Sequence, residues 1–190
     1  MDDVDRYRIA FVGASRVGKT TLIASQLARR YSAARERTIG VSVHDYYPKT
    51  PDDERLRLQL WDTAGKRCYQ PVPEVLARNA ALIVLAFADA RSFVTMQRRW
   101  YPRARAEQRA AARRGFLEPH LVVAALKADV YGGDVVAHDE VHAAFALSIG
   151  ASYVTVTAKS AASRNAFFAH VDACLAPGLP RVSADAAIGR

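Results

Sequence analysis

Cysteine, long apolar runs and a leader segment are scarce or missing in this chain of 190 residues. Its two cysteines, Cys68 and Cys174, lack metal-ligand spacing and do not suggest a disulfide framework, so a reducing environment is expected. The longest apolar run, residues 80–88, is much shorter than the roughly 20 residues of a membrane-spanning helix. The acidic residues 1–5 precede no apolar segment, which argues against a signal peptide, and Asp2 excludes N-myristoylation. We therefore expect a cytoplasmic protein.

Length and composition fit one globular domain, expected at residues 1–176, followed by a flexible tail at 177–190. Lysine and arginine outnumber the acids by 27 to 19, which gives a net charge of +8. Such a balance is compatible with nucleic acid, an anionic membrane or a solvated surface. No prenylation cysteine stands at this C-terminus.

Strand and helix patterns alternate along the chain, which predicts a three-layer α/β domain with a mostly parallel sheet. The turn-rich residues 48–53 predict one antiparallel hairpin at the edge of that sheet. In the first helix, Leu22, Ile23 and Leu27 are expected to face the core. Strands are expected at 9–12, 41–47, 56–61, 80–88, 121–126 and 153–156, and helices at 21–30, within 62–78, and at 91–113, 139–148 and 163–175.

The sequence G-A-S-R-V-G-K-T, from Gly13 to Thr20, stands between a strand and a helix and matches the P-loop pattern. In this pattern backbone N–H groups curl into an anion nest at the positive end of the helix. Lys19 would neutralise the β- and γ-phosphates, and the Thr20 hydroxyl would bind Mg²⁺. The expected phosphate-binding residues are Gly13, Ser15, Arg16, Val17, Gly18, Lys19, Thr20 and Thr21.

A second motif narrows the class of protein. Trp61-Asp62-Thr63-Ala64-Gly65 ends a strand, so Asp62 can reach the Mg²⁺ shell and the Gly65 N–H can meet a γ-phosphate. This motif resembles the D-T-A-G motif of the Ras superfamily of small GTPases. The segment 37–41, R-T-I-G-V, resembles switch I of the Rab branch, which implies that Thr38 senses Mg²⁺ and the γ-phosphate. The implied metal ligands are Thr20, Thr38 and Asp62.

The same resemblance extends over about residues 7–176 and implies a small G-protein fold with a guanine site. Leu126-Lys127-Ala128-Asp129 resembles N-K-x-D, so Asp129 would accept from guanine N1 and N2 while Lys127 lies over the ring. Thr157-Ala158-Lys159 resembles the S-A-K loop, whose backbone N–H meets the guanine oxygen, and Tyr31 would stack on the base. Adenine lacks the paired donors that Asp129 would accept, which disfavours an ATP-dependent P-loop enzyme.

Two departures bear on activity. Lys66 stands where Rabs carry the glutamine that orients the attacking water, and an ammonium cannot accept a hydrogen bond. Lys66 either touches a γ-phosphate oxygen or points to solvent, and slow hydrolysis is expected in both cases. The implied catalytic set is Lys19, Thr38 and Gly65, with Lys66 at the water-positioning place. Leu126 replaces the motif's asparagine and offers no hydrogen bond, so weaker guanine binding is expected.

Three further departures bear on partners. Arg16 either projects outward or supplies a cation to the phosphates in cis. Val43 replaces the phenylalanine with which Rabs contact effectors, so a typical Rab effector is not expected to bind. The basic residues 91–114 contact anionic lipid or an acidic partner, or form a solvated face that Pro102 kinks. Nucleic acid is an unlikely partner, because no recognition motif accompanies the charge.

The resemblance implies a Rab-type switch that binds GTP or GDP with Mg²⁺ and hydrolyses GTP slowly, in vesicle-mediated transport. Effectors, an exchange factor and an activating protein would bind at residues 31–47 and 62–79, and the protein would be cytoplasmic or peripheral on endomembranes. The alternative is a catalytically dead docking module that holds nucleotide as a structural ligand or holds none.

Overall fold

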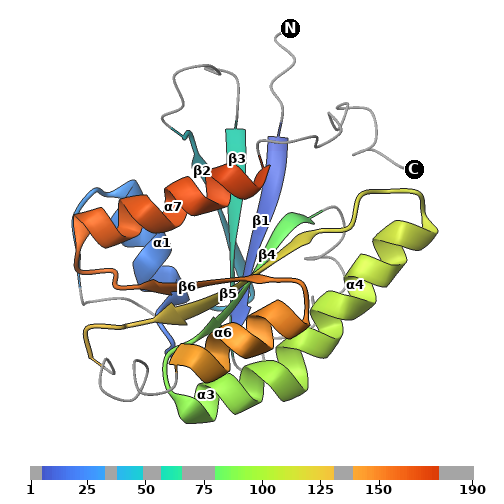
Figure 1. Cartoon of the computed structure of the whole chain (residues 1–190). Coiled ribbons are helices and arrows are strands. Elements are labelled where there is room, and N and C mark those ends of the chain that lie inside the picture. Colours follow the sequence, from blue (N-terminus) through green and yellow to red (C-terminus); the bar gives the residue numbers. More distant parts are fainter. Residues whose placement is uncertain (1–5, 33–37, 49–56, 66–79, 131–138, 176–190) are drawn as a thin grey trace, which may run out of the picture.

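The computed structural model describes residues 6–32, 38–48, 57–65, 80–130 and 139–175. A sheet with the order β2-β3-β1-β4-β5-β6 forms its centre (Figure 1). All neighbouring strands are parallel except β2 and β3, which pair antiparallel at the edge, as the sequence predicts. The strands are β1 (Arg6–Gly13), β2 (Val41–Tyr46), β3 (Arg57–Thr63), β4 (Ala80–Phe87), β5 (His120–Leu126) and β6 (Ser152–Val156).

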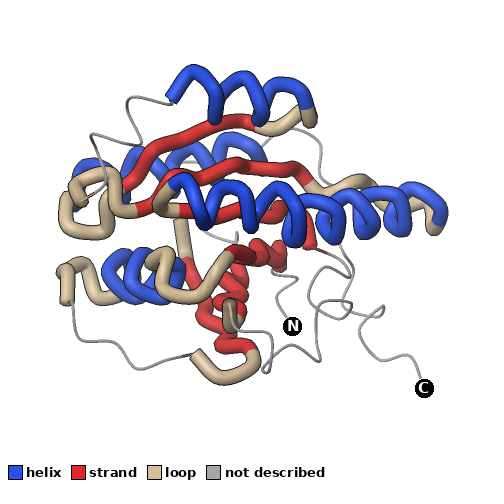
Figure 2. Tube along the Cα trace, turned by 90° about the horizontal axis from the view of Figure 1, so that it is seen from below, coloured by secondary structure: helices blue, strands red, loops and turns tan. Residues whose placement is uncertain are grey.

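Helices cover both faces of the sheet and complete three layers (Figures 1 and 2). On one face, Phe11 and Leu60 of the sheet pack with Ile23 of α1 and Phe168 of α7. On the other face, α3, η2, α4 and α6 enclose a second apolar cluster around Phe87. The helical elements are α1 (Lys19–Leu27), α3 (Ala90–Thr95), η2 (Met96–Trp100), α4 (Tyr101–Arg113), α6 (Asp139–Ser148) and α7 (Ala161–Leu175). The predicted three-layer α/β fold is therefore confirmed.

The helix expected at 91–113 has the predicted extent but is not regular. Its middle turn, η2, is a π-helix in which the Tyr101 N–H donates to the carbonyl of Met96. Pro102 follows in the first turn of α4, where its missing N–H is tolerated. The irregularity that the proline predicts thus takes the form of a widened turn immediately before it.

One core assignment in the first helix was wrong. Leu22 and Ile23 are each 1% exposed and face the core, whereas Leu27 is 37% exposed. Leu27 is the last residue of α1. Helical spacing alone does not reveal where the covering surface ends.

Parallel strands place their carboxyl ends at one edge of the sheet, and in open α/β sheets ligands bind outside that edge. The segments after β1, β5 and β6, and Asp62 near the end of β3, meet there. No helix in the described part of the chain is long and apolar enough to cross a bilayer. The helix expected within 62–78, residue Lys66, most of the segment 62–79 and the tail 177–190 lie outside the described residues.

Candidate functional site

The loop between β1 and α1 has the backbone form of an anion nest. Arg16 adopts a left-handed conformation with φ 67°, and Gly18, the N-cap of α1, has φ 111°. Turns of this kind direct successive N–H groups to one side. No side chain caps the amino end of α1, so its first N–H groups are available to an anion. Ser15 and Arg16 are exposed and Val17 is buried, which places the side chain of Arg16 on the outside of the loop.

Lys19 lies under this loop with only 5% of its surface exposed. Its Nζ donates to the carbonyl oxygens of Gly13 and Ala14, both at 3.0 Å. Burial lowers the pKa of Lys19 to about 8, although the charge of Asp62 acts in the opposite direction. At neutral pH Lys19 is therefore a mostly protonated, poorly solvated cation whose charge a phosphate would stabilise.

Three side-chain oxygens from separate elements meet beside Lys19. The Thr20 hydroxyl of α1 donates to Asp62 Oδ2 at 2.6 Å, and the Thr38 hydroxyl donates to the same oxygen at 3.0 Å. The two hydroxyl oxygens are 2.8 Å apart. Asp62 is 1% exposed, and its Oδ1 is buried without a hydrogen-bond partner among the described residues. An orphaned carboxylate oxygen beside two hydroxyls is an all-oxygen donor set of the kind Mg²⁺ prefers, so these residues fit that ion.

Gly65 packs directly on the phosphate loop. A Cβ atom at this position would lie 2.2 Å from the Ser15 nitrogen and 2.4 Å from the Ala14 carbonyl carbon, so the contact requires glycine. The neighbouring Ala64 N–H donates to the Gly40 carbonyl at 2.9 Å. The segment that carries Thr38 and the segment that carries Gly65 are thus joined to each other beside the loop.

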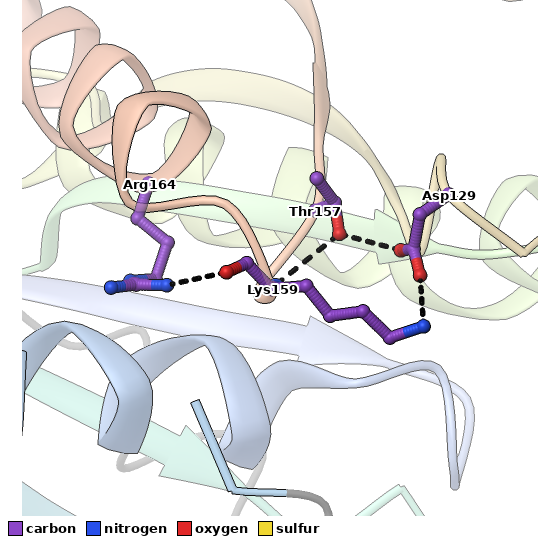
Figure 3. A network of polar contacts seen from close by, with 4 residues as sticks. All are labelled: Asp129, Thr157, Lys159 and Arg164. Carbon is purple, nitrogen blue, oxygen red and sulfur yellow. Dashed lines mark hydrogen bonds and ion pairs between the residues drawn. The ribbon is translucent and has the colours of Figure 1, made fainter. Parts of the chain in front are cut away.

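A second polar cluster lies at the same edge, at the ends of β5 and β6 (Figure 3). Asp129 Oδ1 accepts from the Thr157 hydroxyl at 2.5 Å, and its Oδ2 pairs with Lys159 Nζ at 2.7 Å. Partial burial alone would raise the pKa of Asp129, but the bonds from Lys159 and Thr157 hold it below its usual value. Asp129 is therefore an ionised carboxylate. A base that enters here would share or replace the Lys159 contact.

Residues at this cluster differ in how they face the site. Lys127, with φ 59°, directs its stem along the phosphate loop, where its carbons would lie 3.6 Å from a Cβ at Gly18. Tyr31 is 40% exposed and lies close enough to Lys159 to influence its pKa, which the Asp129 contact chiefly raises. Leu126 is 2% exposed and packs in the core, so its side chain belongs to the core and not to the polar cluster.

The structure thus brings together Lys19, Thr20, Thr38, Asp62 and Gly65 around the loop, and Asp129, Thr157 and Lys159 a short way along the same edge. Thr21 and Ala158 are partly buried next to these clusters. Sequence reasoning missed Arg164, whose Nη1 donates to the Ala158 carbonyl at 2.6 Å. The available signal was an arginine on the apolar stripe of α7, at helical spacing from Phe167, Phe168 and Val171.

A strand, an anion nest, a helix and a buried lysine beside an oxygen triad define a P-loop nucleotide-binding protein. The Ras family model matches residues 8–175, and the chain belongs to this family as a Rab-like small GTPase. Ras-related protein Rab-42 of Mus musculus is 36% identical over 85 residues, 43% of this chain and 40% of that protein. Ras-related protein Rab-11B of Dictyostelium discoideum is 36% identical over 93 residues, 48% of this chain and 42% of that protein.

A third relative is the human EF-hand calcium-binding domain-containing protein 4B, 36% identical over 98 residues, which are 50% of this chain and 13% of that protein. The matched stretch spans about two fifths of the length of the two Rab relatives. The family and the fold are therefore shown, whereas the activity and partners of the whole protein follow as proposals.

Proposed function

We propose that this protein is a Rab-type guanine-nucleotide switch that hydrolyses GTP slowly and acts in vesicle-mediated transport. The observation that carries the proposal is the meeting of Thr20, Thr38 and Asp62 beside Lys19, with Asp129 at the same edge of the sheet. One cluster fits the phosphates and Mg²⁺, and the other fits a base. The G domain would comprise residues 1–176, with 177–190 as a tail.

The nucleotide would lie across both clusters. The ionised Asp129 would accept from N1–H and N2–H of guanine, and adenine offers no such pair of donors. Amides of the 157–159 loop would meet the guanine oxygen, and Tyr31 would stack on the ring. Thr20, Thr38 and Asp62 would hold Mg²⁺, which when bound supplies charge neutralisation at the phosphate oxygens. Lys19 would donate to the β- and γ-phosphates.

Switching would act through the two segments that meet at the loop. Thr38 and the Gly65 N–H would contact the γ-phosphate, and the Ala64–Gly40 hydrogen bond couples the segments. Effectors, an exchange factor and an activating protein would bind at residues 31–47 and 62–79. Val43, 48% exposed and opposite Trp61 in the register of β2 and β3, presents a smaller surface than phenylalanine, so the effector would differ from a typical Rab effector.

Hydrolysis would proceed by in-line attack of water on the γ-phosphate, and Lys66 would limit its rate. An ammonium donates but cannot accept a hydrogen bond, so it cannot orient a water through the water's own proton. Lys66→Gln is expected to raise the single-turnover rate of GTP hydrolysis by about tenfold or more, because the amide both donates and accepts. The rate is read from the decay of GTP preloaded on the protein.

Lys66→Met serves as the matched control, because it removes the charge without supplying an acceptor. Equal rates for the native, glutamine and methionine forms would mean that this position has no part in hydrolysis. Loaded GTP that stays intact in the native protein would favour the second candidate, a docking module that does not turn over. This second candidate is supported by Lys66 and by Leu126, which offers no hydrogen bond to the base loops.

We also propose contact between residues 91–114 and an anionic membrane face. This segment has eight arginines and one acid, Glu107. Arg98, Arg109 and Arg113 are exposed, and Phe116 and Leu117, directly after the helix, are 57% and 52% exposed. A basic surface ending in exposed apolar side chains suits an anionic bilayer, to which each arginine adds about 1 kcal/mol.

The triple change Arg109→Gln, Arg113→Gln and Arg114→Gln is expected to weaken binding to phosphatidylserine vesicles about a hundredfold. Co-sedimentation measures this loss, with phosphatidylcholine vesicles as the neutral control. Binding that is equally weak before and after the change would identify the face as merely solvated.

A further inference from the structure

Arg164 is a buried cation in an apolar surrounding. It is 3% exposed and lies on the stripe of α7 that also carries Phe167, Phe168 and Val171. No carboxylate lies within ion-pair distance of it in the part of the chain that the structure describes. Burial of an uncompensated charge is costly, so its retention requires that the guanidinium serve a structural or functional purpose.

The guanidinium holds the loop that follows β6. Nη1 donates to the Ala158 carbonyl at 2.6 Å. It also reaches the Lys159 carbonyl at 3.4 Å (Figure 3). Because the peptide between these residues is trans and planar, a carbonyl of Ala158 turned toward α7 directs the Lys159 N–H to the opposite side. That N–H donates to the Thr157 hydroxyl oxygen at 3.3 Å, and the same hydroxyl donates to Asp129 on the side of the second polar cluster. Arg164 therefore helps to set which way the Lys159 amide faces.

Leu126 of β5 cannot take over this role. Leu126, at the carboxyl end of β5, is an apolar core residue and cannot hydrogen-bond the 157–159 loop. The loop is also tied to α7 through the Thr157 N–H, which donates to the Ser163 hydroxyl at 3.1 Å, one residue before Arg164. Both of these ties to α7 come from its first turn, and Arg164 supplies the one made by a charged side chain.

We propose that Arg164 is a positioning residue for guanine recognition: it fixes the 158–159 backbone so that loop amides face the guanine O6, a task for which Leu126 has no polar group. The inference rests on the proposed function. It assigns base recognition partly to a residue that contacts no atom of the nucleotide. The role is specific to O6, because the N1 and N2 groups are read separately by Asp129.

The test compares GDP with 6-thio-GDP, which keeps N1–H and the 2-amino group but replaces O6 with sulfur, a weak acceptor. Arg164→Met is expected to weaken the binding of GDP about tenfold and the binding of 6-thio-GDP about twofold or less. The difference arises because only the O6 contact depends on the loop. Arg164→Lys, which keeps one donor group, is expected to recover part of the GDP affinity. Dissociation of a fluorescent GDP, competed by each nucleotide, gives the affinities.

Arg57→Met, which removes the arginine of the pair with Asp45, is the matched control and should leave both affinities unchanged. The melting curve shows whether Arg164→Met folds. If it does not, a comparison of Arg164→Lys with the native protein still gives the ratio of the affinities for GDP and 6-thio-GDP. Equal losses for GDP and 6-thio-GDP, or no loss, would overturn the positioning role. Failure of the native protein to bind GDP would instead contradict the proposed function itself.

Discussion

Lys19→Met should weaken binding of GDP and GTP by about a hundredfold or more. Lys19 is buried beneath the nest with its ammonium directed at the loop carbonyls of Gly13 and Ala14, where phosphate oxygens would compete for its protons. Hydrogen bonds to charged groups contribute about 1.5–3 kcal/mol each, and two phosphate contacts would be lost. Titration calorimetry with Mg²⁺ and GDP measures the change, with Arg113→Met as a control for the loss of one positive charge.

The same substitution should change how the stability of the empty protein depends on pH. Burial lowers the pKa of Lys19 to about 8, below its unfolded value of about 10.4. Between these values the unfolded chain binds more protons, so the free energy of unfolding rises with pH across that window. Lys19→Met should abolish this rise and should not lower the melting temperature at pH 7. A steep drop of the melting temperature at pH 7 would contradict this expectation, because it would show that the ammonium stabilises the empty loop.

Asp129→Asn should convert a preference for guanine into one for xanthine. The carboxylate of Asp129, with its lowered pKa, suits the two donors of guanine, and an amide can accept only one of them. The amide NH₂ can instead donate to the C2 carbonyl that xanthine has in place of the amino group. GDP binding should weaken about a hundredfold, and XDP should bind more tightly to the variant than to the native protein.

Competition of GDP, XDP and ADP against a fluorescent nucleotide checks this reversal. The Thr157 bond to Oδ1 can persist in the variant, so the local fold should be retained. Asp45→Asn, which weakens the exposed pair with Arg57, is the matched control. An unchanged order of the three nucleotides would mean that Asp129 does not read the base.

Local patterns predicted much of this molecule. The phosphate loop, D-T-A-G and the segments 126–129 and 157–159 each lie within a few residues, so their spacing is visible in the sequence. Residue periodicity likewise fixed the strands and the extent of the long helix. Tertiary packing decided the rest: Arg164 meets a loop that the fold brings to it, and Leu27, the last residue of α1, is left exposed. The π-turn before Pro102 depends on how a helix accommodates a ring, which the proline alone does not specify.

The proposed function requires that this chain bind guanine nucleotide with Mg²⁺ at the edge shared by the two clusters. The most direct measurement denatures freshly purified protein, identifies the released nucleotide, and then melts the emptied protein with GTP or ATP and Mg²⁺. We predict that GDP or GTP is recovered, and that the melting temperature rises with GTP but not with ATP. An empty protein that GTP does not stabilise, or one that ATP stabilises equally, would contradict it.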